Sequence, residues 1–302
     1  MIIYMNFQHD IEQITAANLK ALGLKDPNLY TADKQSDLLL DNLMRQVPVQ
    51  KYNVHISKEL AGKLTHLPVR QELLGVINCF QSGLPIYPYL SKKVGNIEES
   101  DPLLKHWGIN HLHPVADGQR DKQGFIVKRS SWILFFRVDK ADAYLIDVLS
   151  HPKGVGWSNQ ALVQIADRNW PHLHTLVSTS REISEKLSDA DYHTLRSKKK
   201  NANALVMTDR GQVAANFGVV CSGASLSSVV ERDYVQWVLA KVQDEIRMFL
   251  TMHEIDCSSS NVLEQSKKAP YVRLVRLVEA QDDGWLCHDS ATGRLLKLPK
   301  TF

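Results

Sequence analysis

The sequence contains few of the features that mark secreted or membrane proteins. Only four of its 302 residues are cysteines, and no two of them form a Cys-x-x-Cys pair. A zinc ribbon and a dense disulfide framework are therefore not expected. The densest apolar run, residues 132–136, is much too short to cross a bilayer, and the N-terminus becomes polar too early for a signal peptide. We expect a cytoplasmic protein with no membrane partner.

Several common catalytic motifs are also missing. The sequence has no Gly-x-Gly-x-x-Gly, no Walker A motif and no Gly-x-Ser-x-Gly, which are the signatures of dinucleotide binding, phosphate-loop binding and the serine nucleophile elbow. A charged fraction of 23% and a net charge of +3 are ordinary for a globular protein and permit nucleic-acid binding without requiring it. We expect no cofactor.

The order of apolar and polar segments predicts an α+β fold with three regions. Residues 1–100 form a mainly helical region. Residues 101–253 form an α+β domain with a small antiparallel central sheet and a long helix. Residues 254–302 begin with a segment of linker composition and end in a small β unit.

Two helices are predicted on specific residues. A helix over residues 69–81 has an apolar stripe, and Gly83 suits the left-handed position after its end. The longest helix spans residues 228–250, where apolar residues keep a helical period, and Ser228-Val-Val-Glu231 matches a capping box at its start.

The segment of residues 107–153 carries the strongest sheet pattern. Three apolar runs of strand length are separated by polar, turn-rich loops, which predicts three adjacent strands. The runs lie within residues 107–113, 131–138 and 144–153.

Three histidines accompany these strands. His111 and His113 alternate along the first strand, so they share one face, and His151 follows the third strand. Imidazole titrates near neutral pH and could transfer protons. The alternatives are a three-histidine metal site and solvent-facing histidines without a function, in a chain that has 12 of them.

Basic residues near these strands are candidates for binding a phosphate, because guanidinium groups bind phosphate oxygens bidentately. Arg129, Arg137 and Lys153 are predicted to complete a catalytic group with the histidines. Arg137 ends an apolar strand, where a core position is the alternative, and for Lys153 the alternative is a capped turn. For Arg120, Lys122, Lys128 and residues 196–200 the alternative is a solvated basic loop. The predicted nucleic-acid-binding residues are Arg120, Lys122, Lys128, Arg196, Lys198, Lys199 and Lys200.

Residues 107–168 resemble the RelE/ParE/HigB group of bacterial toxin domains in the order of a strand with histidines, a polar turn, an apolar strand with arginine, a strand ending in basic residues, and a helix. The resemblance implies a compact, metal-independent ribonuclease sheet in which basic residues take the place of a metal ion. The toxins' arginine is displaced here, so Arg129 or Arg137 would have to serve, and their paired lysine is reduced to His151 and Lys153. The chain is also about three times the usual toxin length. The matching pieces are residues 109–113, 132–137, 145–153 and 159–168.

These patterns lead to the hypothesis of a metal-independent endoribonuclease of toxin or phage-defence type. A histidine would take the proton from a ribose 2′-hydroxyl, an arginine would hold the scissile phosphate, and a second histidine or Lys153 would protonate the leaving oxygen. The expected partners are RNA or another nucleic acid, and a protein antitoxin or defence protein. One alternative is a non-catalytic interaction module of such an assembly. Another is a metal-dependent nuclease with His111, His113 and His151 as ligands.

Overall fold

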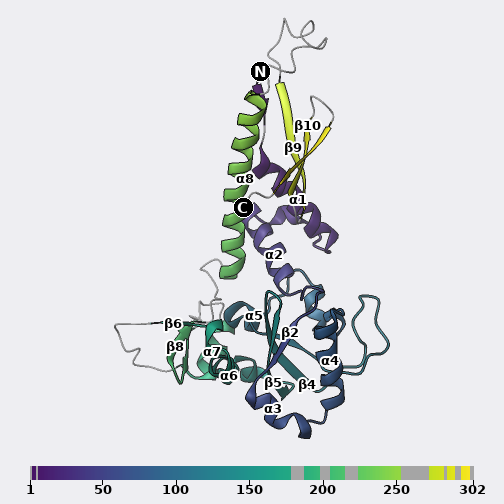
Figure 1. Cartoon of the computed structure of the whole chain (residues 1–302), viewed down its shortest axis with the longest axis vertical. Helices are drawn as coiled ribbons and strands as arrows, with labels where there is room; N and C mark the ends of the chain where they lie inside the picture. The colour runs from purple at the N-terminus through teal and green to yellow at the C-terminus, as the bar shows by residue number, and fades with distance from the viewer. Residues whose placement is uncertain are drawn as a thin grey trace, which may run out of the picture. The chain divides into compact units, whose positions relative to one another are not determined.

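The computed structural model describes residues 2–4, 6–177, 187–197, 205–214, 224–252, 272–281, 284–289 and 294–299. The described residues combine helices with mainly antiparallel sheets, which confirms the α+β class (Figure 1). Contacts divide the chain into two units, one of residues 1–39 with 230–302 and the other of residues 40–229. The sequence analysis placed the boundaries after residues 100 and 253. The difference arises because the two ends of the chain share one sheet, while residues 40–100 pack against the central strands.

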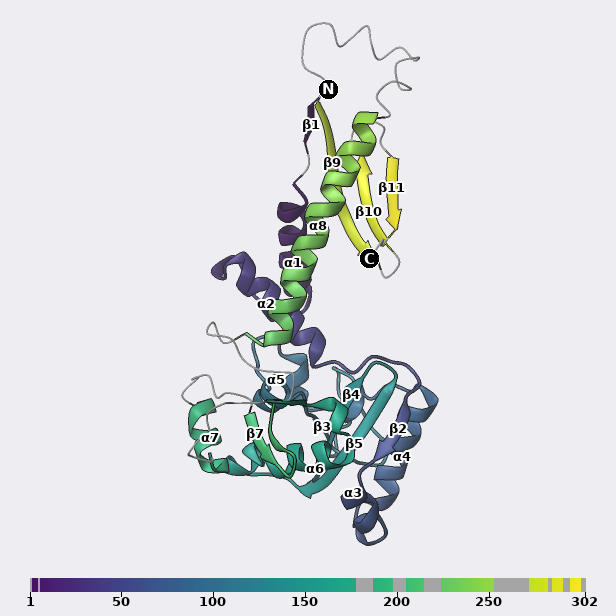
Figure 2. The same ribbon diagram turned by 60° about the vertical axis from the view of Figure 1, so that its left-hand side comes forward.

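The first unit contains a four-stranded sheet built from both ends of the chain (Figure 2). Its order is β1-β9-β10-β11, with β1 parallel to β9 and the other pairs antiparallel. The three C-terminal strands agree with the predicted β unit, whereas the three-residue β1 is too short to produce a sequence pattern. The predicted linker of residues 254–271 lies outside the described residues. The elements are β1 (Ile2–Tyr4), α1 (Phe7–Ala21), η1 (Pro27–Leu29), β9 (Val272–Gln281), β10 (Gly284–Asp289), β11 (Arg294–Pro299) and parts of α2 (Ala32–Met44) and α8 (Leu226–Met252).

The second unit is organised around a sheet of order β2-β5-β4-β3. The three strands predicted between residues 107 and 153 are present and antiparallel, as β3 (Asn110–Leu112), β4 (Trp132–Asp139) and β5 (Asp142–Ser150). The prediction of a purely antiparallel sheet was wrong, because β2 (Asn53–Ile56) joins the other edge parallel to β5. This strand has only four residues and no buried side chain, so it left no hydrophobic pattern.

Both faces of this sheet are covered. On one face, Leu134 and Phe136 pack in a core with residues of α3 (Lys58–Lys63) and α4 (Arg70–Ser82). On the other face, Ile133 and Phe135 pack in a second core. A sheet buried on both faces needs apolar side chains at successive positions, which explains the unbroken apolar run of β4. The helices of the second core are α5 (Pro102–Trp107), α6 (Ala161–Asn169) and α7 (Asp189–Ser197).

Shorter elements complete the second unit. An antiparallel sheet of order β6-β8-β7 contributes to the second core. Its strands are β6 (Thr175–Leu176), β7 (Leu205–Thr208) and β8 (Gly211–Ala214), and the 3-10 helices are η2 (Leu64–His66), η3 (Tyr87–Tyr89), η4 (Lys92–Gly95), η5 (Gly154–Ser158) and η6 (Pro171–Leu173).

The two predicted helices are confirmed, with one correction. Helix α4 ends at Gly83, which takes the expected left-handed conformation at φ +72°. Helix α8 begins at Leu226, two residues before the predicted start. Ser228 is therefore not the cap. Instead, the Ser225 hydroxyl accepts a hydrogen bond from the Ser228 N–H, because Ser225 stands three residues before an unpaired amide of the first turn.

A buried polar cluster connects three helices of the second unit. The Asp41 carboxylate in α2 forms an ion pair with Lys105 of α5 and accepts a 2.6 Å hydrogen bond from the Ser228 hydroxyl. Ser225 in turn bonds to Ser228 at 2.6 Å. Asp41 and both serines are buried. Charges in such a place are tolerated because each one has partners.

We predict that Asp41→Ala lowers the free energy of unfolding by about 3–5 kcal/mol, since it leaves the Lys105 ammonium buried without its partner. The matched control is Asp117→Ala, which removes an exposed ion pair with Arg120 and should cost less than about 1 kcal/mol. Chemical denaturation of both variants checks this. Equal losses in the two variants would show that the buried cluster does not stabilise the fold.

Candidate functional site

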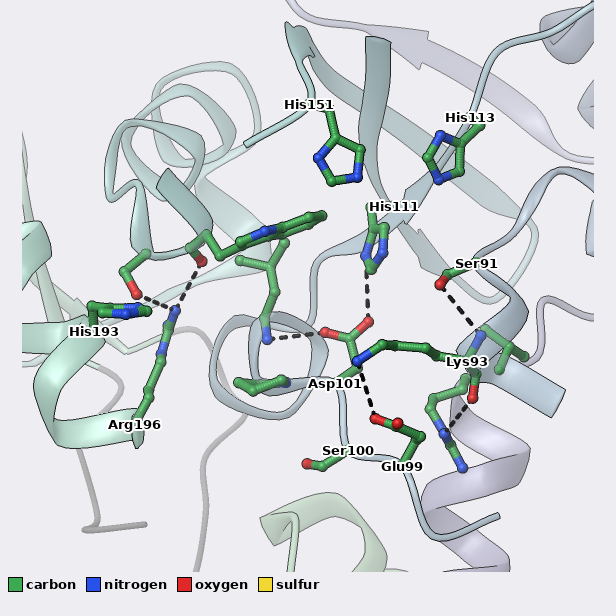
Figure 3. A pocket seen from close by; sticks show the side chains of 16 residues that line it. Ser91, Lys93, Glu99, Ser100, Asp101, His111, His113, His151, His193 and Arg196 are labelled. Carbon is green, nitrogen blue, oxygen red and sulfur yellow. Dashed lines mark hydrogen bonds and ion pairs between the residues drawn. The ribbon is translucent and has the colours of Figure 1, made fainter. Parts of the chain in front are cut away.

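A pocket of about 470 Å³ lies in the unit of residues 40–229 (Figure 3). Its volume falls within the range of small-molecule sites, roughly 300–1,000 Å³. Side chains from η4, α5, β3, η5 and α7 form its walls. The lining residues are Arg45, Ser91, Lys93, Val94, Glu99, Ser100, Asp101, Pro102, Leu103, His111, His113, His151, Trp157, Ser158, His193 and Arg196.

His113 follows strand β3, where the backbone N–H of His113 donates to the Tyr89 carbonyl. Its Nδ1 lies 3.1 Å from the carbonyl oxygen of Ser130. Burial lowers the pKa of His113 to about 4, and the positive charge of Arg129 adds to this shift, although the bond to Ser130 opposes it. The ring is therefore neutral at pH 7. Its Nδ1–H donates to the carbonyl, and Nε2 carries the lone pair.

His151 follows strand β5 and faces His113. The backbone N–H of His151 donates to the Ser131 carbonyl, which extends the pairing of β4 with β5 by one residue. The His151 Nδ1 lies 3.0 Å from the Pro152 carbonyl oxygen. The rings of His113 and His151 are stacked, with centroids 5.8 Å apart and planes inclined by 28°. Two imidazoles that follow β3 and β5, the strands on either side of β4, can therefore contact the same small group.

His111 lies on β3 and is oriented by Asp101. Its Nδ1 is 3.3 Å from an oxygen of the Asp101 carboxylate, whose other oxygen accepts the N–H groups of Leu103 and Leu104 and so caps α5. Burial by itself would raise the pKa of Asp101, but His111 and the two amides outweigh burial and hold that pKa below its usual range. Asp101 is thus a carboxylate at neutral pH.

The three histidines share one arrangement. Each Nδ1 faces an oxygen of the protein, and within the described residues no protein group binds the three Nε2 atoms. Figure 3 shows the three rings near one another in one part of the pocket. Trp157 packs edge-on against His111 and His151, with ring centroids 5.0 and 5.5 Å away. The pocket therefore presents three oriented imidazole nitrogens that can donate or accept a proton.

Arg196 lies at another part of the wall. Its Nη1 donates to the Trp157 carbonyl and the Ser158 hydroxyl, both at 3.1 Å, and its guanidinium lies 4.1 Å from the centre of the Trp107 ring. Burial lowers the pKa of Arg196 to about 10, so the side chain stays positive at neutral pH. The sequence analysis predicted Arg196 as a nucleic-acid-binding residue of a basic run, with a solvated loop as the alternative. The structure places Arg196 in the last turn of α7.

The structure brings together the three predicted histidines but not the predicted cations of the catalytic group. The pocket walls do not include Arg129, Arg137 or Lys153. Arg129 donates to the Leu90 carbonyl at 2.7 Å, and Arg137 is buried where it donates to the Leu173 carbonyl at 2.9 Å. Lys153 is exposed at the start of η5. The prediction of one group was wrong for these three because strand order places them near one another in sequence but says nothing of where their side chains point.

The predicted nucleic-acid-binding residues are similarly divided. Arg120, Lys122 and Lys128 are exposed in the loop between β3 and β4, and Arg120 is paired with Asp117. Lys198, Lys199 and Lys200 lie outside the described residues. Of the whole set, only Arg196 is seen in the pocket wall.

Asp101 and Trp157 are site residues that the sequence analysis missed. Asp101 caps the start of α5 through its side chain. Nothing in the spacing of residues 101, 111 and 157 indicates that tertiary packing brings them together. Asp101 and Trp157 reach the site only because α5 and η5 pack near the end of β3.

The alternative prediction for the histidines was a three-histidine metal site. In the ranges that the structure describes, no group of three or more His, Cys, Asp or Glu side chains is placed to hold a metal ion. His111, His113 and His151 therefore share a pocket without forming a ligand set there. Across the same ranges, no helix combines the length and the apolar character needed to cross a membrane.

We find no match to this chain among protein-family models, curated proteins or solved structures. The resemblance of residues 107–168 to the bacterial toxin domains therefore stays a prediction.

Proposed function

We propose that the protein is a metal-independent ribonuclease whose reaction takes place in the histidine pocket. One observation carries the proposal: three imidazoles, each oriented through Nδ1, present unpartnered Nε2 atoms to a single pocket in the described part of the chain. General acid–base catalysis needs a proton acceptor and a proton donor within reach of one reacting group. The stacked pair of His113 and His151 supplies two such groups.

In the proposed reaction, His113 acts as the base. Its Nε2 takes the proton of a ribose 2′-hydroxyl, and the 2′-oxygen attacks the adjacent phosphorus. The bond from phosphorus to the 5′-oxygen breaks, and His151 gives a proton to that oxygen. The products are a 2′,3′-cyclic phosphate and a 5′-hydroxyl, and no metal ion or cofactor is consumed.

His111 and Asp101 have a supporting role. A positively charged His111 would stabilise the charge that develops on the phosphoryl oxygens, and the Asp101 carboxylate, 3.3 Å from its Nδ1, would orient the ring. This arrangement assigns the positive charge of the catalytic group to an imidazole rather than to Arg129 or Arg137.

We also propose where the protein acts and what regulates it. We place the protein in the cytoplasm, where RNA is present, and we keep a protein antitoxin or defence partner as a proposed regulator. A chain that binds RNA or a protein without cleaving RNA would instead be an interaction module.

We predict that His113→Gln and His151→Gln each reduce RNA cleavage by about 100-fold or more, the usual scale for a general acid or base. The assay follows cleavage of a labelled oligonucleotide in EDTA and identifies the cyclic phosphate by mass. His66→Gln, which changes an exposed histidine outside the pocket, is the matched control and should retain full activity.

Three outcomes of this assay would contradict the proposal. Full activity in both pocket variants would remove the histidines from the mechanism. Loss of wild-type activity in EDTA would indicate a metal-dependent nuclease. Absence of cleavage alongside RNA or protein binding would favour the interaction module.

We predict an acidic limit of activity near pH 4. A base must be deprotonated, and deprotonated His113 predominates above its pKa of about 4, whereas an ordinary histidine would lose this form below about 6.5. The kcat/KM of the wild type should therefore not fall as the pH is lowered from 6.5 to 5. NMR titration of the His113 ring gives an independent measurement, and a midpoint near 6.5 there would contradict the assignment.

A further inference from the structure

Among the described residues, three lysine or arginine side chains line the pocket, and the protein itself already engages two of them. Arg196 donates through Nη1 to a carbonyl and a hydroxyl of η5, and its other two nitrogens are enclosed. Arg45 is buried, and all three of its guanidinium nitrogens donate to backbone carbonyls, those of Asp41, Lys93, Asn96 and Ile97. Neither guanidinium can turn toward a ligand without breaking these bonds.

The third cation, Lys93, is in a different situation. Its side chain is 72% exposed although it belongs to the pocket wall, and its ammonium lies 3.3 Å from the carboxylate of Glu99, another wall residue. Figure 3 shows this pair, with the Lys93 side chain extending from η4 toward Glu99. An exposed ion pair contributes little to stability, so the ammonium can exchange one anion for another at low cost.

The backbone that carries this side chain is held in place. The N–H of Lys93 donates to the Ser91 hydroxyl at 3.4 Å, and the Lys93 carbonyl accepts from Arg45 at 3.2 Å. The next residue, Val94, is buried, and its carbonyl accepts from the Asn42 side chain at 3.3 Å. Lys93 is therefore a flexible arm on an anchored base. Such an arm suits a phosphate, which a lysine ammonium binds as a point charge without a fixed geometry.

We infer that Lys93 binds a phosphate of the RNA strand that enters the pocket, and that this phosphate replaces Glu99 as the partner of the ammonium. The inference rests on the proposed function for the identity of the substrate. An RNA strand carries a phosphate at every nucleotide, so a strand that reacts at the imidazoles brings further phosphates to the same pocket. In the free protein, Glu99 keeps the ammonium paired and competes with RNA for it.

The first test measures binding of a single-stranded oligodeoxynucleotide, which lacks the 2′-hydroxyl that the proposed reaction needs, to the full chain in EDTA. Lys93→Met should weaken binding by about tenfold or more, the scale of a hydrogen bond to a charged group. It should also reduce the slope of log Kd against log salt concentration by about 0.7, the contribution of one phosphate contact in a single strand.

Lys92→Met is the matched control for this test. Lys92 is the neighbouring lysine, pairs with Asp121 and lies outside the pocket walls. Its substitution removes the same charge from the same segment, and the Kd should change by less than about twofold.

A second test examines the exchange of partners. Glu99→Gln removes the competing carboxylate and should tighten binding by about two- to fivefold, the range that an exposed ion pair spans. In combination with Lys93→Met, the same substitution should have no larger effect than Glu98→Gln, which removes an exposed neighbouring charge outside the pocket walls. An equal gain with and without Lys93 would contradict the exchange.

The outcomes separate this inference from the catalytic proposal. Unchanged binding in Lys93→Met, an equal loss in Lys92→Met, or no binding of the oligonucleotide by the wild type would overturn the inference. A loss of binding specific to Lys93→Met, in a protein that cleaves no RNA, would support the phosphate contact and contradict the ribonuclease. RNA cleavage by the wild type with an unchanged kcat/KM in Lys93→Met would retain the ribonuclease and overturn the phosphate contact.

Discussion

The pairing of β4 with β5, buried on both faces, is the constraint on which the second unit depends. Because Leu134 and Phe136 face one core while Ile133 and Phe135 face the other, the strands have no side open to water. The middle of β4 therefore carries apolar side chains, and Asp147, a charged residue buried within β5, is paired with Lys63. His113 and His151 follow the ends of β3 and β5, and His111 lies on the edge strand β3. The pocket forms where the covered sheet stops.

Backbone carbonyls at these strand ends determine the chemistry of the histidines. The oxygens of Ser130 and Pro152 have no strand partner, and each lies within hydrogen-bonding distance of an imidazole Nδ1. A carbonyl can only accept, so it selects the tautomer with the proton on Nδ1 and leaves Nε2 as the reactive nitrogen. Burial then keeps His113 neutral at physiological pH. Orientation and protonation state therefore both follow from the local backbone.

The unit contains two buried positive charges in opposite situations. Lys105 is matched by Asp41, which Ser228 also bonds, so this charge contributes to the fold. Arg196 is held by a carbonyl, a hydroxyl and the Trp107 ring, with two nitrogens unpaired among the described residues. Burial lowers the pKa of Arg196, and the nearby Tyr192, Asp101 and Asp189 oppose this shift.

The sequence determined the parts of this protein that depend on local pattern. Apolar runs of strand length specified β4 and β5, and apolar periodicity with Gly83 specified α4. Strand alternation placed His111 and His113 on one face, and both line the pocket. Tertiary structure decided the rest: β2 pairs parallel to β5, Ser225 rather than Ser228 caps α8, and Asp101 and Arg196 reach the pocket while Arg129 and Arg137 do not. The physical reason is that a sequence pattern reports on neighbours within one helix or strand and not on contacts between distant segments. Periodicity reports which side chains of one element share a face, whereas a pocket depends on which elements pack together and on where each long side chain finds a partner.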